Sequence, residues 1–145
     1  GTVLLTIINS EFGAASETLV QKVQTAMDPE VNAGEGYGLA PMGHVVKVES
    51  AKEKRIDIQS TLTFEEGYGW GNLQGLLEEA ICDYLMELRK EWADSSCLIV
   101  RVSQVDNRLL NVPGVVDVRG TSINGMSENL YLGEYEIPVF GGVNE

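Results

Sequence analysis

The stretch RIDIQSTLTF at residues 55–64 decides which fold this chain can adopt. Its polarity alternates, and one face of the extended backbone would carry Ile56, Ile58, Ser60, Leu62 and Phe64. This period of two predicts a strand with one face in a core and the other in solvent. HVVKVE at 44–49 also predicts a strand, and AKEK after it predicts a polar turn. We therefore expect an antiparallel hairpin over residues 44–64.

A long amphipathic helix is expected over residues 72–93, after the glycine cluster GYGWG at 67–71. The apolar residues that recur there at helical spacing are Leu73, Leu76, Leu77, Ala80, Ile81, Tyr84, Leu85, Leu88 and Trp92. VSQVDNRLLNV predicts a second, shorter helix that ends at Pro113-Gly114. VVDV, INGMSENLYLG and EIPVF predict terminal strand-like pieces with turns. Together these elements predict an antiparallel sheet covered on one face by two helices.

Residues 1–35 read as a small βα unit. Residues 3–8 are apolar and β-branched, and a helix is expected from an N-cap at Ser16 to Asp28-Pro29. One strand and one helix cannot bury their own apolar faces, so we expect this unit to continue a truncated upstream domain. Residues 36–145 are then a C-terminal α+β domain holding the hairpin, both later helices and the terminal strands. The expected class of the whole chain is α+β.

The composition restricts the kinds of partner. The 145 residues carry a net charge of −12, which disfavours nucleic acid, because phosphate contacts need clustered Lys and Arg. An anionic membrane surface would also repel this chain, and no apolar run approaches the ~18 residues of a membrane span. An acidic surface suits a partner protein with basic patches. Cys82 and Cys97 lie beside apolar residues and predict buried free thiols in a reducing compartment.

The glycine stretch GEGYGLAPMGH at residues 34–44 raises the question of a ligand site. A phosphate loop would run into a helix, whereas this stretch runs into an expected strand and carries Glu35. We interpret its glycines as positions of positive φ or of close backbone approach. His44 is the only histidine, and neither a catalytic partner nor paired cysteines for a zinc site accompany it. We therefore predict no cofactor-binding and no metal-binding residues.

The remaining catalytic candidates are acidic residues of the expected long helix, namely Glu78, Glu79, Asp83, Glu87 and Glu91. Glu79, Asp83 and Glu87 are spaced four apart opposite the apolar stripe, which is typical of a solvated face. A glycosidase-type acid needs a recessed site that raises its pKa, and no pattern here indicates one. We predict no catalytic residue and no enzyme.

Three aromatic residues, Tyr37, Tyr68 and Trp70, lie on the glycine loops. Exposed, they would grip a sugar or a partner protein; buried, they would close the ends of the sheet. We favour the buried arrangement.

Two segments in combination resemble the baseplate J-like family of contractile phage tails and defective prophages. The first is GEGYGLAPMGHVVKV, in which the matching residues are Gly36, Gly38, Ala40, Pro41, Gly43, His44 and Val46. The second is LLNVPGVVDVRG at 109–120 followed by INGMSENLYLGEYEIPVFGGV at 123–143. Its matching residues are Gly114, Val115, Asp117, Asn124, Gly125, Asn129, Leu130, Leu132, Glu136, Ile137, Pro138 and Gly141. The order and spacing of the segments fit the family over nearly the whole chain.

The resemblance implies a structural, non-catalytic protein of the tail baseplate, without a cofactor. It implies a wedge component arranged with six-fold symmetry around a hub, so other wedge and hub proteins are the expected partners. The implied location is the baseplate of the virion tail, after assembly in the cytoplasm of the bacterial host. Ile137, Val139 and Phe140 are the candidate partner contacts; alternatively, they close the domain's own core.

Two other classes of function stay open. The acidic surface and the loop aromatics also suit a protein-binding adaptor outside phage biology. A tail-associated hydrolase would have to use Glu78, Glu79 and Asp83.

Overall fold

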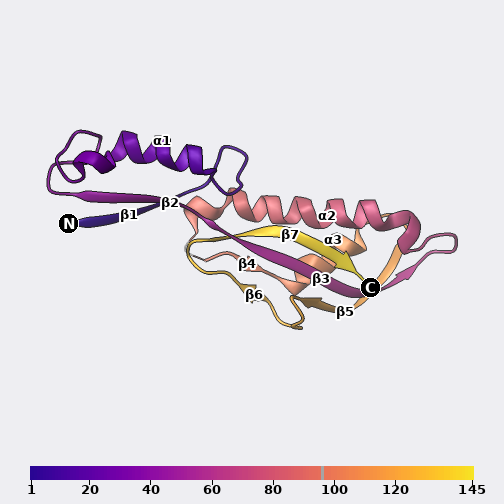
Figure 1. Cartoon of the computed structure of the whole chain (residues 1–145). Coiled ribbons are helices and arrows are strands. Elements are labelled where there is room, and N and C mark those ends of the chain that lie inside the picture. The colour runs from indigo at the N-terminus through magenta and orange to yellow at the C-terminus, as the bar shows by residue number, and fades with distance from the viewer. Residues whose placement is uncertain (96) are drawn as a thin grey trace. The chain divides into compact units, whose positions relative to one another are not determined.

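The computed structural model describes residues 1–95 and 97–145. The chain divides into two compact units, Gly1–Lys52 and Glu53–Glu145 (Figure 1). Helices and strands both contribute, which confirms the α+β class.

The first unit is a βαβ arrangement rather than a βα one. Strand β1 (Thr2–Ile7) leads to helix α1 (Glu17–Met27), a short 3-10 helix η1 (Glu30–Asn32) and strand β2 (Val45–Ser50). The two strands pair in parallel over their full length, and α1 packs against β2. Its core consists of Ala40, Val46 and Val48, with Leu5, Ile7, Val20, Val23 and Met27 packed against them and partly buried.

Helix α1 begins and ends where the sequence predicts. The Ser16 hydroxyl accepts a hydrogen bond from the Leu19 N–H at 3.2 Å, which is the geometry of an N-cap. Asp28 is extended and Pro29 follows it, so the helix stops there.

The expected hairpin over residues 44–64 is wrong. β2 pairs with β1, while the next strand, β3 (Lys52–Phe64), pairs within the second unit. The expected turn AKEK is already part of this strand from Lys52 on, and Ala51 before it is buried. The compact units therefore divide between Lys52 and Glu53, and the glycine stretch expected to mark the break near residue 36 lies inside the first unit. Alternation specifies which face of a strand is buried but does not specify its neighbour.

The second unit contains a three-stranded sheet in the order β5-β3-β7. After β3 come helix α2 (Trp70–Lys90), the 3-10 helix η2 (Trp92–Asp94), strand β4 (Ile99–Val100) and helix α3 (Val102–Leu110). Strands β5 (Val115–Ile123), β6 (Leu130–Tyr131) and β7 (Glu136–Asn144) complete it. β5 is antiparallel to β3, and Figure 1 shows β7 running in the same direction as β3. The sheet is thus mixed rather than purely antiparallel, and β4 and β6 form a separate antiparallel pair.

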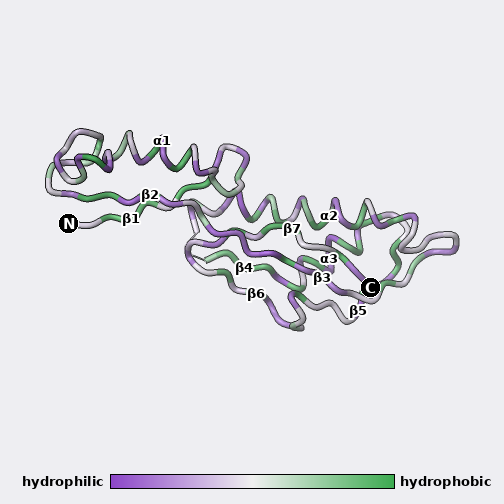
Figure 2. Tube along the Cα trace, viewed as in Figure 1, coloured by the Kyte–Doolittle hydropathy of each residue, from purple (hydrophilic) through white to green (hydrophobic). Residues whose placement is uncertain are grey.

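Both helices cover the same side of this sheet. α2 packs against β7 and α3, and α3 packs against β5. Figure 2 shows apolar residues recurring along α2 among polar ones, and the fully buried members of that stripe are Leu77, Ile81 and Leu85. From β3 the same core receives Ile56 and Ile58, as the alternation of 55–64 predicts. The other side of β3 carries only polar side chains, namely Arg55, Asp57, Gln59, Thr61 and Thr63.

Candidate functional site

The glycine loop of residues 34–44 is folded around a carboxylate that belongs to the chain itself. Asp28 is 1% exposed, and its carboxylate accepts hydrogen bonds from the Gly34 N–H at 2.9 Å and the Val46 N–H at 3.0 Å. Gly34, Gly36 and Gly43 have φ values of 79°, 78° and 91°, which favour glycine. An external phosphate would need free N–H groups of such a loop, and the Asp28 carboxylate already binds the Gly34 N–H of the loop and the Val46 N–H of β2.

The same loop closes the C-terminal end of α1. The N–H groups of Leu39 and Ala40 donate to the carbonyls of Ala26 and Met27 at 2.9 and 2.8 Å. A Cβ on Gly38 would lie 2.5 Å from the Met27 carbonyl oxygen, so the loop can approach the helix only with glycine there. The glycines of this segment that match the family pattern therefore allow positive φ or a close backbone approach, as the sequence predicts.

Apart from Ala40, which is buried, the large apolar side chains of the loop are exposed: Tyr37 is 71% exposed, Leu39 78% and Met42 78%. Val31, in the preceding η1, is 93% exposed. The expectation that Tyr37 closes the end of a sheet is wrong, because the glycines around it let the backbone, not the ring, fill the space against α1. No periodic pattern in this stretch marks these side chains as exposed.

His44 directly precedes β2, as expected, and is exposed, as is Pro41. Its N–H donates to the Pro41 carbonyl at 3.1 Å, which is a turn. Among residues 1–95 and 97–145, His, Cys, Asp and Glu side chains form no group of three or more that could hold a metal ion.

Gln24 contributes a feature that sequence reasoning missed. Its amide lies beside the outward edge of β2, where Nε2 donates to the Val46 carbonyl at 2.8 Å and Oε1 accepts from the Val48 N–H at 2.8 Å. Nε2 also donates to the Asp28 carbonyl at 2.7 Å. With the Asp28 carboxylate, this side chain satisfies the backbone of β2 as a neighbouring strand would. A glutamine within an otherwise apolar helical stripe was the available signal.

The second family-type segment also places its residues on backbone tasks. Gly114 has φ of 101°, and a Cβ there would lie 2.9 Å from the Tyr68 ring. Its carbonyl accepts from the Glu65 N–H at 2.8 Å. Val115 is part of the core, and Asp117 is exposed on β5 opposite Thr63.

Asn124 and Gly125 form a two-residue turn with φ values of 51° and 81°. Ile123 and Met126 exchange both backbone hydrogen bonds across it, at 2.8 and 3.1 Å. The Asn124 side chain also accepts from the Asp57 N–H at 2.7 Å and donates to the Arg55 carbonyl at 3.0 Å. This asparagine therefore joins the turn to β3.

Asn129 caps a helix that is distant in sequence. Its Oδ1 accepts from the Val102 N–H at 2.9 Å, at the start of α3, where the N-cap residue Arg101 provides no side-chain cap. Leu130 follows it and pairs with Val100 between β6 and β4. Leu132 is buried in the core.

The last family-type residues hold β7 in place. The Glu136 carboxylate accepts from the Gly133 N–H at 2.6 Å, and the Pro138 carbonyl accepts from Arg89 at 2.8 Å. Burial lowers the pKa of the Arg89 guanidinium from its ordinary value. A Cβ on Gly141 would collide with the carboxylate of Asp57, so glycine lets that side chain cross β7.

The candidate contact residues of β7 differ in access. Ile137 is 0% exposed and thus interior to the chain. Phe140 is partly buried and packs against the core, whereas Val139 is half-buried. Ile137 therefore closes the domain's own core, which is one of the two arrangements expected for this segment. Only Val139 and part of Phe140 could contact a partner.

The acidic residues of α2 form a solvated face, as expected. Glu79, Asp83 and Glu87 are exposed, and Glu87 pairs with Arg108 of α3. Arg108 also lies over the Tyr84 ring, 5.2 Å from its centroid. A hollow of about 320 Å³ between α2 and α3 has Leu76, Ala80, Val112 and Pro113 in its lining, with Glu79 and Asp83. Glu79 and Asp83 are exposed on one helix face, so neither lies in the recessed environment of a glycosidase-type general acid.

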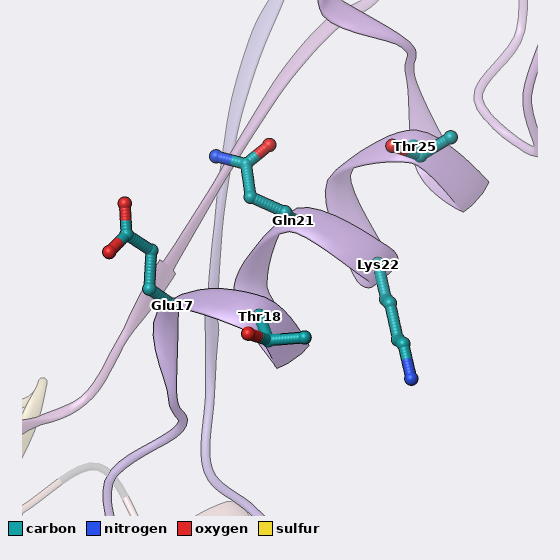
Figure 3. A pocket seen from close by; sticks show the side chains of 5 residues that line it. All are labelled: Glu17, Thr18, Gln21, Lys22 and Thr25. Carbon is teal, nitrogen blue, oxygen red and sulfur yellow. The ribbon is translucent and has the colours of Figure 1, made fainter.

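A second hollow, of about 600 Å³, lies along α1 and is lined by Glu17, Thr18, Gln21, Lys22 and Thr25. Figure 3 shows that these side chains point in different directions and do not converge on one point. A ligand site requires a few convergent polar groups, and these five side chains do not provide such a set. None of the helices described is both long enough and apolar enough to cross a membrane.

The two cysteines are free thiols, as expected, but they are not both buried. Cys82 is half-buried, and burial raises the pKa of its thiol. Cys97 is exposed, because its neighbours Leu98 and Val100 face the core and it does not. The Cys97 thiol donates to the Leu132 carbonyl at 2.9 Å, so its contact is with the backbone.

A buried polar chain links β3, β5 and α3, and sequence reasoning missed it. The Ser60 and Thr121 hydroxyls are 2.8 Å apart, and Thr121 donates to the Asp106 carboxylate. Ser60 and Thr121 are 3% and 6% exposed, so the chain is a structural connection and not a reactive site. Ser60 in the alternating apolar set of β3 was the available signal.

Comparisons with known proteins agree with this structural interpretation. A family model described as baseplate J-like protein C-terminal domain matches residues 56–144. The phage-like element PBSX protein XkdT of Bacillus subtilis (strain 168) is 37% identical over 143 residues, and protein YqbT of the same strain is 35% identical over 144. Each match covers 99% of this chain and 39% of the relative, so the chain spans about two fifths of the length of these curated relatives.

Proposed function

This chain belongs to the baseplate J-like protein family, and on that premise we propose that it forms part of a structural, non-catalytic subunit of a phage or prophage tail baseplate. The observation that carries the proposal is the family match over residues 56–144, which contains the second unit almost entirely. The relative XkdT is named as a protein of a phage-like element, which supports the same role.

The use of the family-type residues supports a non-catalytic role. Asn124 and Asn129 each accept a hydrogen bond from a distant backbone N–H. Gly114 and Gly141 leave room for the side chains of Tyr68 and Asp57, where a Cβ would collide. Residues that form turns and helix caps fix the conformation of the backbone. A subunit of an assembly needs such a defined shape, because its interfaces must be complementary to those of its partners.

The finer proposal is a wedge component that assembles with other wedge and hub proteins in six-fold symmetry. Such a subunit would assemble in the host cytoplasm and reside in the virion tail baseplate. In a ring of repeated copies, many weak apolar contacts add up, so no single deep pocket is required. The exposed apolar side chains Tyr37, Leu39 and Met42 suit contacts of this kind.

Immunogold electron microscopy tests this proposal. Particles released from the induced source strain are labelled with antibody against this chain, and a tagged full-length copy serves as the control. We expect gold at the baseplate end of contractile tails. Well-formed tails without gold, while the tagged control labels normally, would overturn the baseplate role and favour the adaptor outside phage biology.

A further inference from the structure

The two edges of the sheet in the first unit are treated differently. The Gly1 carbonyl accepts from the Val45 N–H, and the Ile7 carbonyl accepts from the Ala51 N–H, both at 2.9 Å. The backbone groups of odd-numbered β1 residues therefore face β2, and those of Thr2, Leu4 and Thr6 face outward. On the far side of β2, Gln24 and Asp28 bind the N–H and carbonyl of Val46 and the N–H of Val48, whereas in the described chain β1 has no second strand.

The side chains of β1 show the same incompleteness. Val3 is 44% exposed and Leu4 46%, although Figure 2 shows this strand as largely hydrophobic. Leu5 and Ile7 pack into the small core, so Leu4 and Thr6 belong to the opposite face. The Thr6 hydroxyl is buried without a hydrogen-bond partner among the described residues. Parallel strands are normally covered on both faces and belong to sheets of more than two strands.

The lengths of the relatives point to one kind of occupant for this edge. Both relatives are matched over only 39% of their length, and the matched family domain is a C-terminal one that begins at residue 56. We propose that β1 is an interior strand of the full-length protein, and that its outward edge pairs with a strand from the part of the longer chain outside these 145 residues. This inference rests on family membership and not on the baseplate role, so the two fail independently.

Residue-resolved hydrogen exchange of the β1 amides tests the pairing. In the 145-residue chain, the amides of Thr2, Leu4 and Thr6 should exchange fast, while those of Val3, Leu5 and Ile7 are protected. In the full-length protein, the outward three should slow by about 100-fold or more, because they then exchange only when the added strand opens. An unchanged alternation in the full-length protein would overturn the proposal.

The substitution Leu4→Pro separates the possible occupants. Its ring removes an outward N–H without removing a bond to β2, and edge strands tolerate proline at such positions. We expect the variant to lower the hydrogen-exchange protection of β1 in the full-length protein. Its oligomeric state, measured by sedimentation, should not change. If full-length protein instead dissociates into smaller species on Leu4→Pro, the occupant is a second copy, and the proposal is wrong.

Discussion

The two units of this chain reach order by different means. Among the described residues, the second unit buries sixteen apolar residues in one core, whereas the core of the first consists of three. The first unit compensates with polar side chains, because Gln24 and Asp28 hold the edge of β2 and the loop that follows α1. The second unit is therefore stabilised mainly by apolar burial, whereas the first is specified by hydrogen bonds and leaves apolar surface for something else to cover.

The largest effect is expected in the core of the second unit. Ile81 is fully buried in α2, so Ile81→Ala should lower the free energy of unfolding by about 2–5 kcal/mol through lost contacts and a cavity. Leu76→Ala on the same helix is the matched control, because Leu76 is 47% exposed and its loss should cost about 0.5 kcal/mol or less. Denaturant unfolding measures both. Equal costs would mean that α2 is not the support of this core.

A smaller and local effect is expected in the first unit. Asp28→Ala leaves the Gly34 and Val46 N–H groups without their acceptor, at a cost of about 1–3 kcal/mol. Hydrogen exchange should show faster opening of β2 and the glycine loop, with no change in the second unit. Glu35→Ala is the control, since Glu35 is exposed on the same loop. Loss of protection in α2 as well would show that the units do not open separately.

How much of this could be predicted depends on the range of the interactions. The period of two in residues 55–64 and the period near 3.6 in 72–93 predicted β3 and α2, because each pattern is local. The parallel pairing of β2 with β1 could not be predicted this way, since the two are joined through α1 and a loop of irregular structure. The hydrogen bonds of Gln24 and of Asn129 link positions 22 and 27 residues apart, which no local pattern specifies.

Some of the candidate site was within reach of the sequence. Asn124-Gly125 is the dipeptide that two-residue hairpin turns prefer, so the turn itself can be predicted from these two residues alone. The roles of Gly38 and Gly141 could not be predicted from the sequence, because each depends on atoms of a different element that approaches the glycine closely. The exposure of Tyr37 depends likewise on how the glycines around it fold.

A long-range cap offers a smaller test of the second unit. Asn129→Ala removes the acceptor for the Val102 N–H and should cost about 1 kcal/mol, as other N-cap losses do. The exposed neighbour Ser127 provides the control variant Ser127→Ala. Thermal or denaturant unfolding of the two variants measures the difference. If both behave alike, water replaces the asparagine, and the resemblance at this position has another cause.

The smallest effect is expected where the first unit is most apolar on its surface. Leu39 and Met42 are each 78% exposed, so Leu39→Ser combined with Met42→Ser should change stability by at most about 0.5 kcal/mol. Val48→Ser is the contrasting control, because Val48 is 5% exposed and belongs to the core of three. A large loss on the double substitution would mean that the loop packs inward in solution. A negligible loss, together with reduced incorporation of the full-length variant into tails, would assign these side chains to contacts with a partner. The apolar side chains of the first unit would then serve assembly, whereas those of the second unit serve its own core.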